Sequence, residues 1–198
     1  MVGKLTRAFF ARDTRIVARE LLGTLLVRVM DDGTRLSGRI METEAYRPGD
    51  AAAHSFRKQT PRNAPMFGEA AFAYVYFVYG MHFCFNVVTE KIGVGAAVLV
   101  RALEPLEGVE QMQQNYDVAV KDLCRGPARL CKAMQIGRDY SGYDMQQKGS
   151  TLFIEQGQAI EDERVATSPR IGVSGDETAK TIAWRWFVRD SGFVSGSK

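Results

Sequence analysis

The chain has 198 residues, 45% of them hydrophobic, and carries a formal net charge of +3. This length and composition predict a single globular domain, residues 1–198, with a core of its own. No stretch approaches the ~20 apolar residues that cross a bilayer, which excludes a membrane-spanning helix, and the first residues lack the apolar stretch of a signal peptide. We therefore expect a soluble, intracellular protein. We also expect a monomer and, for a bacterial source, a location in the cytoplasm.

The first half of the chain predicts one helix, four strands and one long loop. Asp13 can cap the helix and Gly23 would end it. Period-two alternation and β-branched or aromatic residues mark the strands. The loop is rich in Pro, Gly, Ala and basic residues, and long loops of this kind are often functional. In chain order, we expect a helix over residues 14–22, strands over 24–30 and 35–46, a loop over 47–69, and a hairpin over 70–90 that turns at 79–81.

The second half predicts two helices among four strands. We expect a strand over residues 96–105, helices over 104–115 and 122–134, and strands over 150–157, 164–174 and 183–190. The second helix is expected to break at Gly126-Pro127, where proline can start a new first turn. The strands come in hairpins rather than βαβ units, which favours a mixed architecture. The expected fold is a single α+β domain with a largely antiparallel, curved β-sheet surrounded by helices, and with a protruding aromatic β-hairpin.

Two glutamates and a tyrosine stand at the end of the strand 35–46. Alternation places Glu42, Glu44 and Tyr46 on one face of this strand. A carboxylate at a strand end that leads into a long loop is a common position for a general base, and Glu44 lies nearer to the loop. The alternative is that both glutamates are solvated residues at the edge of a sheet.

Aromatic residues alternate along the predicted hairpin. Phe72, Tyr74 and Tyr76 fall on one face, whereas Phe77 and Tyr79 fall on the other. Core packing is the simpler explanation for Phe72 and Phe77. Tyr79 is different, because a large ring beside a turn glycine is expected to point into solvent.

The loop before the hairpin is basic. Residues 57–63, RKQTPRN, supply three cations with Thr60 and Asn63 between them. Cations beside aromatic rings suit a protein that stacks bases and holds a nucleic-acid backbone. A solvated basic loop is the alternative, and His54 in the same loop could equally be an exposed or hydrogen-bonded structural residue.

Cysteine and histidine usage argues against a metal site. Cys84, Cys124 and Cys131 are odd in number and have no CxxC spacing, and only His54 and His82 could join them. This set favours free thiols in a reducing compartment over a closed zinc site. We therefore expect no metal and no cofactor.

Six segments, in order, closely resemble the alkyladenine (3-methyladenine) DNA glycosylase family: GRIMETEAY, AAHS, QTPRN, YVYFVYGMHFCFNV, VLVRALEPLEG and GPARLCKAM. The resemblance runs from about residue 8 to near residue 195, and the chain looks like the compact bacterial form. It implies a monofunctional DNA-3-methyladenine glycosylase, a hydrolase that flips a damaged purine out of duplex DNA and cuts its N-glycosidic bond, which starts base excision repair. Alkylated purines are the expected substrates, and deaminated and etheno purines are further candidates. The expected location of the protein is the bacterial nucleoid.

The resemblance also implies roles for single residues. Glu44 would activate the attacking water, and Arg101 would help to hold that water. The remaining matches are Tyr46, His54, Tyr76 and Asn86 in a base pocket, Tyr79 as the residue inserted into the duplex, and Thr60, Arg62, Met81 and His82 in contact with DNA. His82 departs from the family, whose human-type members have a tyrosine at this place.

Two other functions fit parts of the sequence. One is a non-catalytic nucleic-acid binding module, which would not require both Glu44 and Arg101. The other is a small-molecule enzyme whose pocket takes a nucleoside or a folate-like ring, which would need neither Tyr79 nor the QTPRN loop. The chain lacks the GxxxxGK[ST] phosphate loop, the GxSxG nucleophile elbow and the zinc-deaminase signature. The sequence therefore gives no motif for the enzyme classes that these three patterns mark.

Overall fold

The computed structural model of the chain describes residues 3–196, and one long strand, β2 (Arg35–Tyr46), runs through the middle of its sheet. β2 pairs antiparallel with β1 (Leu25–Val29) over its first half and with β8 (Arg185–Val188) over its second half. Its other edge pairs with β5 (Ala97–Glu107). Of the eight strands within residues 3–196, six follow the order β3-β4-β5-β2-β1-β6, while β8 pairs with β2 and β7 pairs with β8. The remaining strands are β3 (Ala73–Val78), β4 (His82–Val88), β6 (Leu152–Glu155) and β7 (Val165–Ser168).

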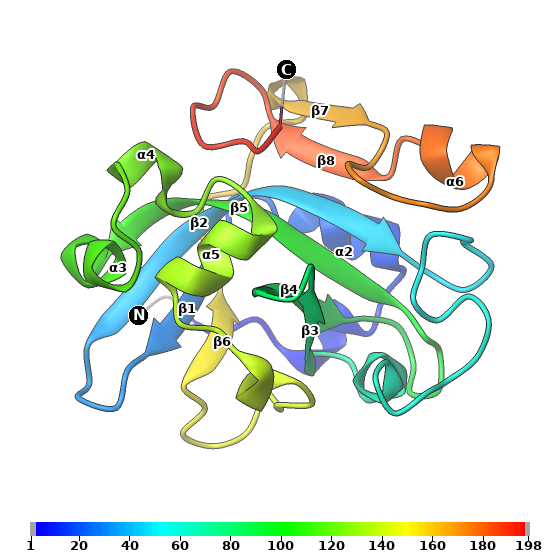
Figure 1. Cartoon of the computed structure of the whole chain (residues 1–198), viewed down its shortest axis with the longest axis horizontal. Helices are drawn as coiled ribbons and strands as arrows, with labels where there is room; N and C mark the ends of the chain where they lie inside the picture. The colour runs from blue at the N-terminus through cyan, green and yellow to red at the C-terminus, as the bar shows by residue number, and fades with distance from the viewer. Residues whose placement is uncertain (1–2, 197–198) are drawn as a thin grey trace.

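Within residues 3–196, six short helices accompany the sheet. In Figure 1, α2 lies behind the sheet, α5 lies in front of it, and α6 lies at the top beside β7 and β8. The Asp13 carboxylate caps α2 by accepting from the Arg15 backbone N–H, and the Thr43 hydroxyl of β2 donates to the Ala18 carbonyl of α2 at 2.7 Å. The helices are α1 (Arg7–Phe10), α2 (Thr14–Glu20), α3 (Val109–Asn115), α4 (Val120–Leu123), α5 (Pro127–Ala133) and α6 (Glu177–Thr181).

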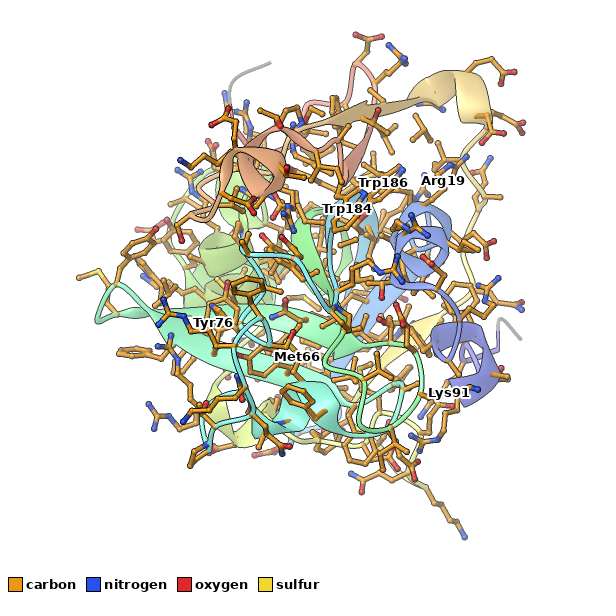
Figure 2. The ribbon with its side chains drawn as sticks, turned by 90° about the vertical axis from the view of Figure 1, so that its right-hand side faces the viewer. Arg19, Met66, Tyr76, Lys91, Trp184 and Trp186 are labelled. Atoms are coloured by element: carbon orange, nitrogen blue, oxygen red, sulfur yellow. The ribbon has the colours of Figure 1, made fainter. Side chains whose placement is uncertain are left out.

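Buried apolar residues form a large core on the sheet and a smaller cluster under the loop 47–69. The smaller cluster is made of Met66, Tyr74, Val88 and Ala97, with partly buried rings packed against it, among them Tyr46 and Tyr76. Figure 2 shows Met66 and Tyr76 on the same side of the molecule, below Trp184 and Trp186. Met66 and Tyr74 of this cluster line a cavity together with Tyr46 and Tyr76.

The predicted α+β class with an antiparallel sheet is confirmed, and so is the break between α4 and α5 at Gly126-Pro127. The largest errors concern two boundaries. β5 continues to Glu107, so the next helix begins only after Gly108, whose φ is +67°. The strand expected over 164–174 ends at Ser168, because Pro169 has no N–H for a ladder. The short helices α1 and α6 were not predicted from the sequence.

Candidate active site

Irregular pairing between β2 and β5 brings acids and an arginine to one face of the sheet. The register shifts on each side of Glu42, so that Met41 on β2 and Arg101 on β5 have no direct partner in the ladder. Such bulges re-aim side chains and are common next to active sites. Here Arg101 reaches both Glu42 and Glu44.

Four charged side chains form what we call the buried ion cluster: Glu42, Glu44, Arg101 and Arg185. Arg101 bridges the two acids, with its Nε 3.1 Å from Glu42 Oε1 and its Nη1 3.2 Å from Glu44 Oε1. Arg185 donates from Nε to the same Glu42 oxygen at 2.6 Å. Neither glutamate side chain is exposed, so the alternative of solvated edge residues is wrong. The two carboxylates and two guanidiniums balance in charge, which buried ions require.

The Glu44 carboxylate is held from three sides. Its Oε1 accepts from the Ile171 backbone N–H at 2.8 Å and faces Arg101, and its Oε2 accepts from the Tyr46 hydroxyl at 2.7 Å. An ionised carboxylate is an acceptor only, so these donors match it. Two strands and the segment after β7 therefore fix the orientation of Glu44.

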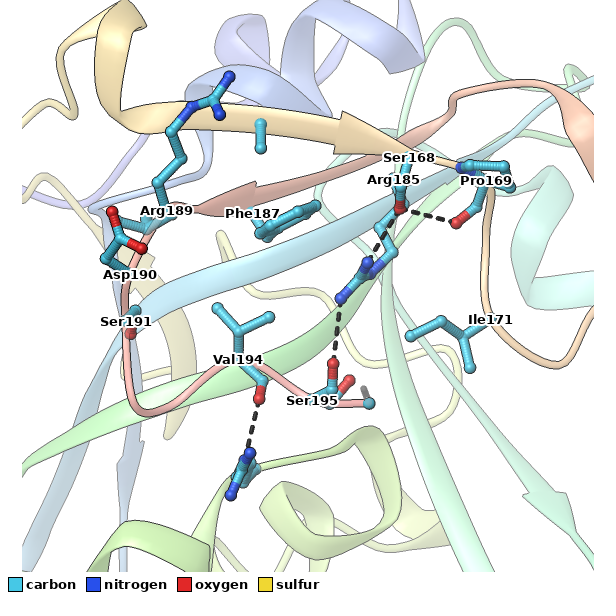
Figure 3. A pocket seen from close by; sticks show the side chains of 14 residues that line it. Ser168, Pro169, Ile171, Arg185, Phe187, Arg189, Asp190, Ser191, Val194 and Ser195 are labelled. Atoms are coloured by element: carbon cyan, nitrogen blue, oxygen red, sulfur yellow. Dashed lines mark hydrogen bonds between the residues drawn. The ribbon is translucent and has the colours of Figure 1, made fainter. Parts of the chain in front are cut away.

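The C-terminal segment supports this cluster from the side of a cavity of about 550 Å³. Ser195 donates its backbone N–H to Glu42 Oε2 at 2.6 Å, and its hydroxyl accepts from Arg101. Figure 3 shows Arg185 on the wall of this cavity, bound to the Ser168 hydroxyl and to the Ser195 carbonyl. The polar groups of Arg185 and Ser195 are thus already used in holding the cluster together.

A second, smaller cavity of about 150 Å³ brings together the four residues expected in a base pocket: Tyr46, His54, Tyr76 and Asn86. They come from the end of β2, the loop 47–69, β3 and β4. The remaining wall residues were not predicted from the sequence: Ala52, Met66, Tyr74, Gly172, Val173 and Ser174. We call this the ring-lined cavity.

The rings are fixed to one another. The His54 and Tyr76 ring centroids lie 4.5 Å apart at 78°, an edge-to-face contact. His54 Nδ1 lies 2.8 Å from the Tyr74 hydroxyl, and the Asn86 amide donates to the Tyr74 carbonyl at 3.0 Å. Desolvation, followed by the charge of Arg62, lowers the pKa of His54 below its ordinary 6.5, so the neutral ring is favoured at pH 7.

The tyrosines of the ring-lined cavity also stay neutral. Burial raises the pKa of Tyr74 to about 12. Burial also raises the pKa of Tyr76 and Tyr46, and the charge of Glu44 adds to the effect on Tyr46. The cavity is therefore walled by uncharged aromatic rings. Tyr46 connects it to the buried ion cluster, because its ring lines the cavity while its hydroxyl binds Glu44.

Residues expected to touch DNA lie at the hairpin turn between β3 and β4. Tyr79 and Met81 are 83% and 70% exposed, and His82 is half-buried. Phe77 is 38% exposed, so core packing does not explain it, whereas Phe72 packs against the smaller cluster as expected.

The basic loop approaches this turn. Arg62, which is exposed, donates from Nη2 to the Phe77 carbonyl of β3 at 3.0 Å. Thr60 and Arg62 line a cavity of about 330 Å³ that shares His54 and Tyr74 with the ring-lined cavity. Arg62 thus connects the basic loop to β3 close to the turn, and the two cavities share part of their walls.

Three residues that contact the predicted site residues were not themselves predicted to belong to the site: Tyr74, Arg185 and Ser195. Arg185 did carry a signal, because it stands between Trp184 and Trp186 in an apolar strand and needs a buried partner there. No sequence signal could have identified the Ile171 backbone N–H, because any residue except proline supplies the same donor.

Residues 3–196 contain neither a candidate metal site nor a membrane-spanning helix. No group of three or more His, Cys, Asp or Glu side chains in that range could hold a metal ion. No helix in the same range is long and apolar enough to span a bilayer.

Comparison with known proteins identifies the family of the chain. A sequence profile of the methylpurine-DNA glycosylase family matches residues 8–192. A protein of Desulfitobacterium hafniense is 45% identical over 97% of this chain and 98% of its own, and one of Chlorobium phaeobacteroides is 42% identical over 98% and 96%. A third, from Herpetosiphon aurantiacus, is 40% identical over 98% and 89%. All three bear the name "Putative 3-methyladenine DNA glycosylase". The chain belongs to the methylpurine-DNA glycosylase family.

Proposed function

We propose that the protein, as one glycosylase domain over residues 1–198, flips a damaged purine out of duplex DNA and hydrolyses its N-glycosidic bond. The observation that carries this is the link between the ring-lined cavity and the buried ion cluster, made by the Tyr46 hydroxyl on Glu44. One part holds a flat base and the other supplies the catalytic carboxylate. The released base leaves an abasic site, the first product of base excision repair.

The ring-lined cavity supports the holding step. Extruding a base costs roughly a few kcal/mol, and stacking on aromatic rings returns roughly 1–3 kcal/mol per base. Alkylation at a ring nitrogen makes the purine cationic, and neutral aromatic rings attract cations over their faces. At about 150 Å³, the cavity is below the ~300–1,000 Å³ of ordinary small-molecule sites. It suits a single base better than a nucleoside or a folate.

The buried ion cluster supports the hydrolytic step. A cationic purine leaves readily, so the reaction needs one base to deprotonate water as the sugar gains oxocarbenium character. Glu44 would be that base, and Arg101 would help to hold the water. Ordinary glycosidases use two carboxylates, but Glu42 is occupied by two arginines and the Ser195 N–H. Because Glu44 alone is assigned to the reaction and would act as the base, alkylated purines are better substrates than neutral ones, which would need an acid as well.

The exposed turn supports the extrusion step. Tyr79 would fill the gap that the flipped nucleotide leaves, with Met81 and His82 beside it in the groove. Thr60 and Arg62 would contact the backbone of the same duplex. Phosphate contacts of this kind position the protein without reading sequence.

The test compares a duplex that carries one alkylated purine with the matching free nucleoside and with undamaged duplex. We expect release of the base from the damaged duplex alone, with binding that weakens steeply as salt rises. Binding of damaged duplex without any release would favour the non-catalytic module. Cleavage of the nucleoside but not of the duplex would favour the small-molecule enzyme.

A further inference from the structure

A second buried ion pair lies behind the ring-lined cavity. The Arg170 side chain has no exposed surface and Asp50 is 2% exposed. The guanidinium binds both carboxylate oxygens, with Nη2 2.8 Å from Oδ1. The pair is therefore neutral as a unit, and bidentate pairs of this kind hold their geometry well.

Arg170 also faces the Tyr46 ring. Its guanidinium carbon lies 4.7 Å from the Tyr46 centroid, and Nη1 donates to the Ala45 carbonyl at 2.9 Å. Tyr46 lines the ring-lined cavity, whereas Arg170 is fully buried and is not part of its wall. The Tyr46 ring thus separates the Arg170 cation from the space where a base would lie.

This placement has an electrostatic consequence for a charged base. An aromatic face attracts cations through its quadrupole, and Arg170 already occupies the rear of Tyr46. A cationic purine against the front of the ring would meet the charge of Arg170 through a dry medium, where like charges are screened little. The Asp50 carboxylate cancels that charge at close range.

We propose that Asp50 is a specificity-determining residue, whose carboxylate neutralises Arg170 so that the front face of Tyr46 accepts cationic purines. The inference rests on the proposed function, because it concerns the choice of base in the same cavity. It predicts opposite effects for the two members of the pair. Removing the charge of Asp50 disfavours cationic bases, and removing that of Arg170 favours them.

The test measures the affinity of the protein for duplexes that carry cationic 7-methylguanine or neutral hypoxanthine. All variants are made in a Glu44→Gln background, so that the base stays attached. Asp50→Asn should weaken binding of the cationic lesion by roughly tenfold relative to the neutral one, the scale of one unit charge at this range. Arg170→Gln should shift the same ratio the other way, and the double variant should restore it.

Asp144→Asn is the control, because Asp144 also binds an arginine with both oxygens, and that arginine, Arg7, faces the Phe72 ring instead of Tyr46. It should leave the ratio unchanged. Melting temperatures identify any variant that fails to fold. If one single variant does not fold, the direction in which the other changes the affinity ratio of the cationic to the neutral lesion tests the inference. Equal losses on both lesions would overturn the inference. If the Glu44→Gln protein binds neither lesion more tightly than undamaged duplex, the proposed function itself fails.

Discussion

The buried ion cluster and the hairpin turn differ in how far their side chains are buried and held in place. Glu42 and Glu44 have no exposed side-chain surface, and strands, bulges and backbone donors hold them. Tyr79 is 83% exposed at a turn. A group that reacts must be oriented before the substrate arrives, whereas a group that enters DNA must be free to reach it. In the proposed function the first region serves hydrolysis and the second serves DNA binding, so variants in the two regions should fail in different ways.

The largest effect is expected at Glu44. Glu44→Gln should keep duplex binding and lower single-turnover base release by roughly 10²–10⁴-fold, the usual contribution of a general base. Glu110→Gln, an exposed glutamate on α3, is the control and should behave as wild type. Near-normal release by Glu44→Gln would remove the hydrolytic role from the buried ion cluster.

Glu42 should show that the same cluster also supports the fold. Glu42→Gln leaves Arg101 and Arg185 without their shared carboxylate, and breaking a buried pair costs about 3–5 kcal/mol. Denaturant titration should therefore show a larger loss of stability for Glu42→Gln than for Glu44→Gln, which leaves Arg101 one acid. Equal stability of the two variants would contradict the supporting role of Glu42.

Tyr79 tests the other region. Tyr79→Ala should weaken binding of damaged duplex by roughly 1–3 kcal/mol, one lost stacking contact, with the melting temperature unchanged because the ring is exposed. Excision from unpaired substrates should fall less, since these need less extrusion. Tyr79→Phe keeps the ring and should bind nearly as wild type. A several-degree drop in melting temperature would instead place Tyr79 in the core.

The smallest effect is a pH dependence that belongs to the ring-lined cavity. The pKa of His54 is lowered in the fold, so below pH 6.5 the unfolded chain binds a proton that the folded chain resists. Stability should fall with acidification by at most about 1.4 kcal/mol per pH unit from this group. In urea titrations at several pH values, His54→Gln should lose this contribution of His54 to the pH dependence of the free energy of unfolding. The control His82→Gln should keep it. An unchanged slope in His54→Gln would contradict a neutral His54.

Much of the sheet could be predicted from local pattern. β2 was expected over residues 35–46 and lies there, because alternation and the preceding turn both fix it. The expected alternation also put Glu42, Glu44 and Tyr46 together. It could not reveal that Arg101 joins them through a bulge, since a register shift depends on two strands at once.

The walls of the ring-lined cavity could likewise be predicted only in part. Resemblance to a family selected Tyr46, His54, Tyr76 and Asn86 one by one, and the fold brings them to one cavity. The opposite wall, residues 172–174, was expected to be strand. It leaves the sheet after Pro169 and is held by the buried Arg170, whose partner Asp50 is 120 positions away in the chain. Long-range ion pairs of this kind leave no periodic signal.

The most direct test of the account is base release by the wild-type protein from a duplex with one alkylated purine, with a chelator present and with a parallel reaction in borohydride. Water activated by Glu44 needs neither a metal nor a lysine nucleophile. We therefore expect the free alkylated base, a strand that stays intact until alkali is added, and no protein–DNA adduct. Bound duplex whose base is never released, or an adduct trapped by borohydride, would contradict it.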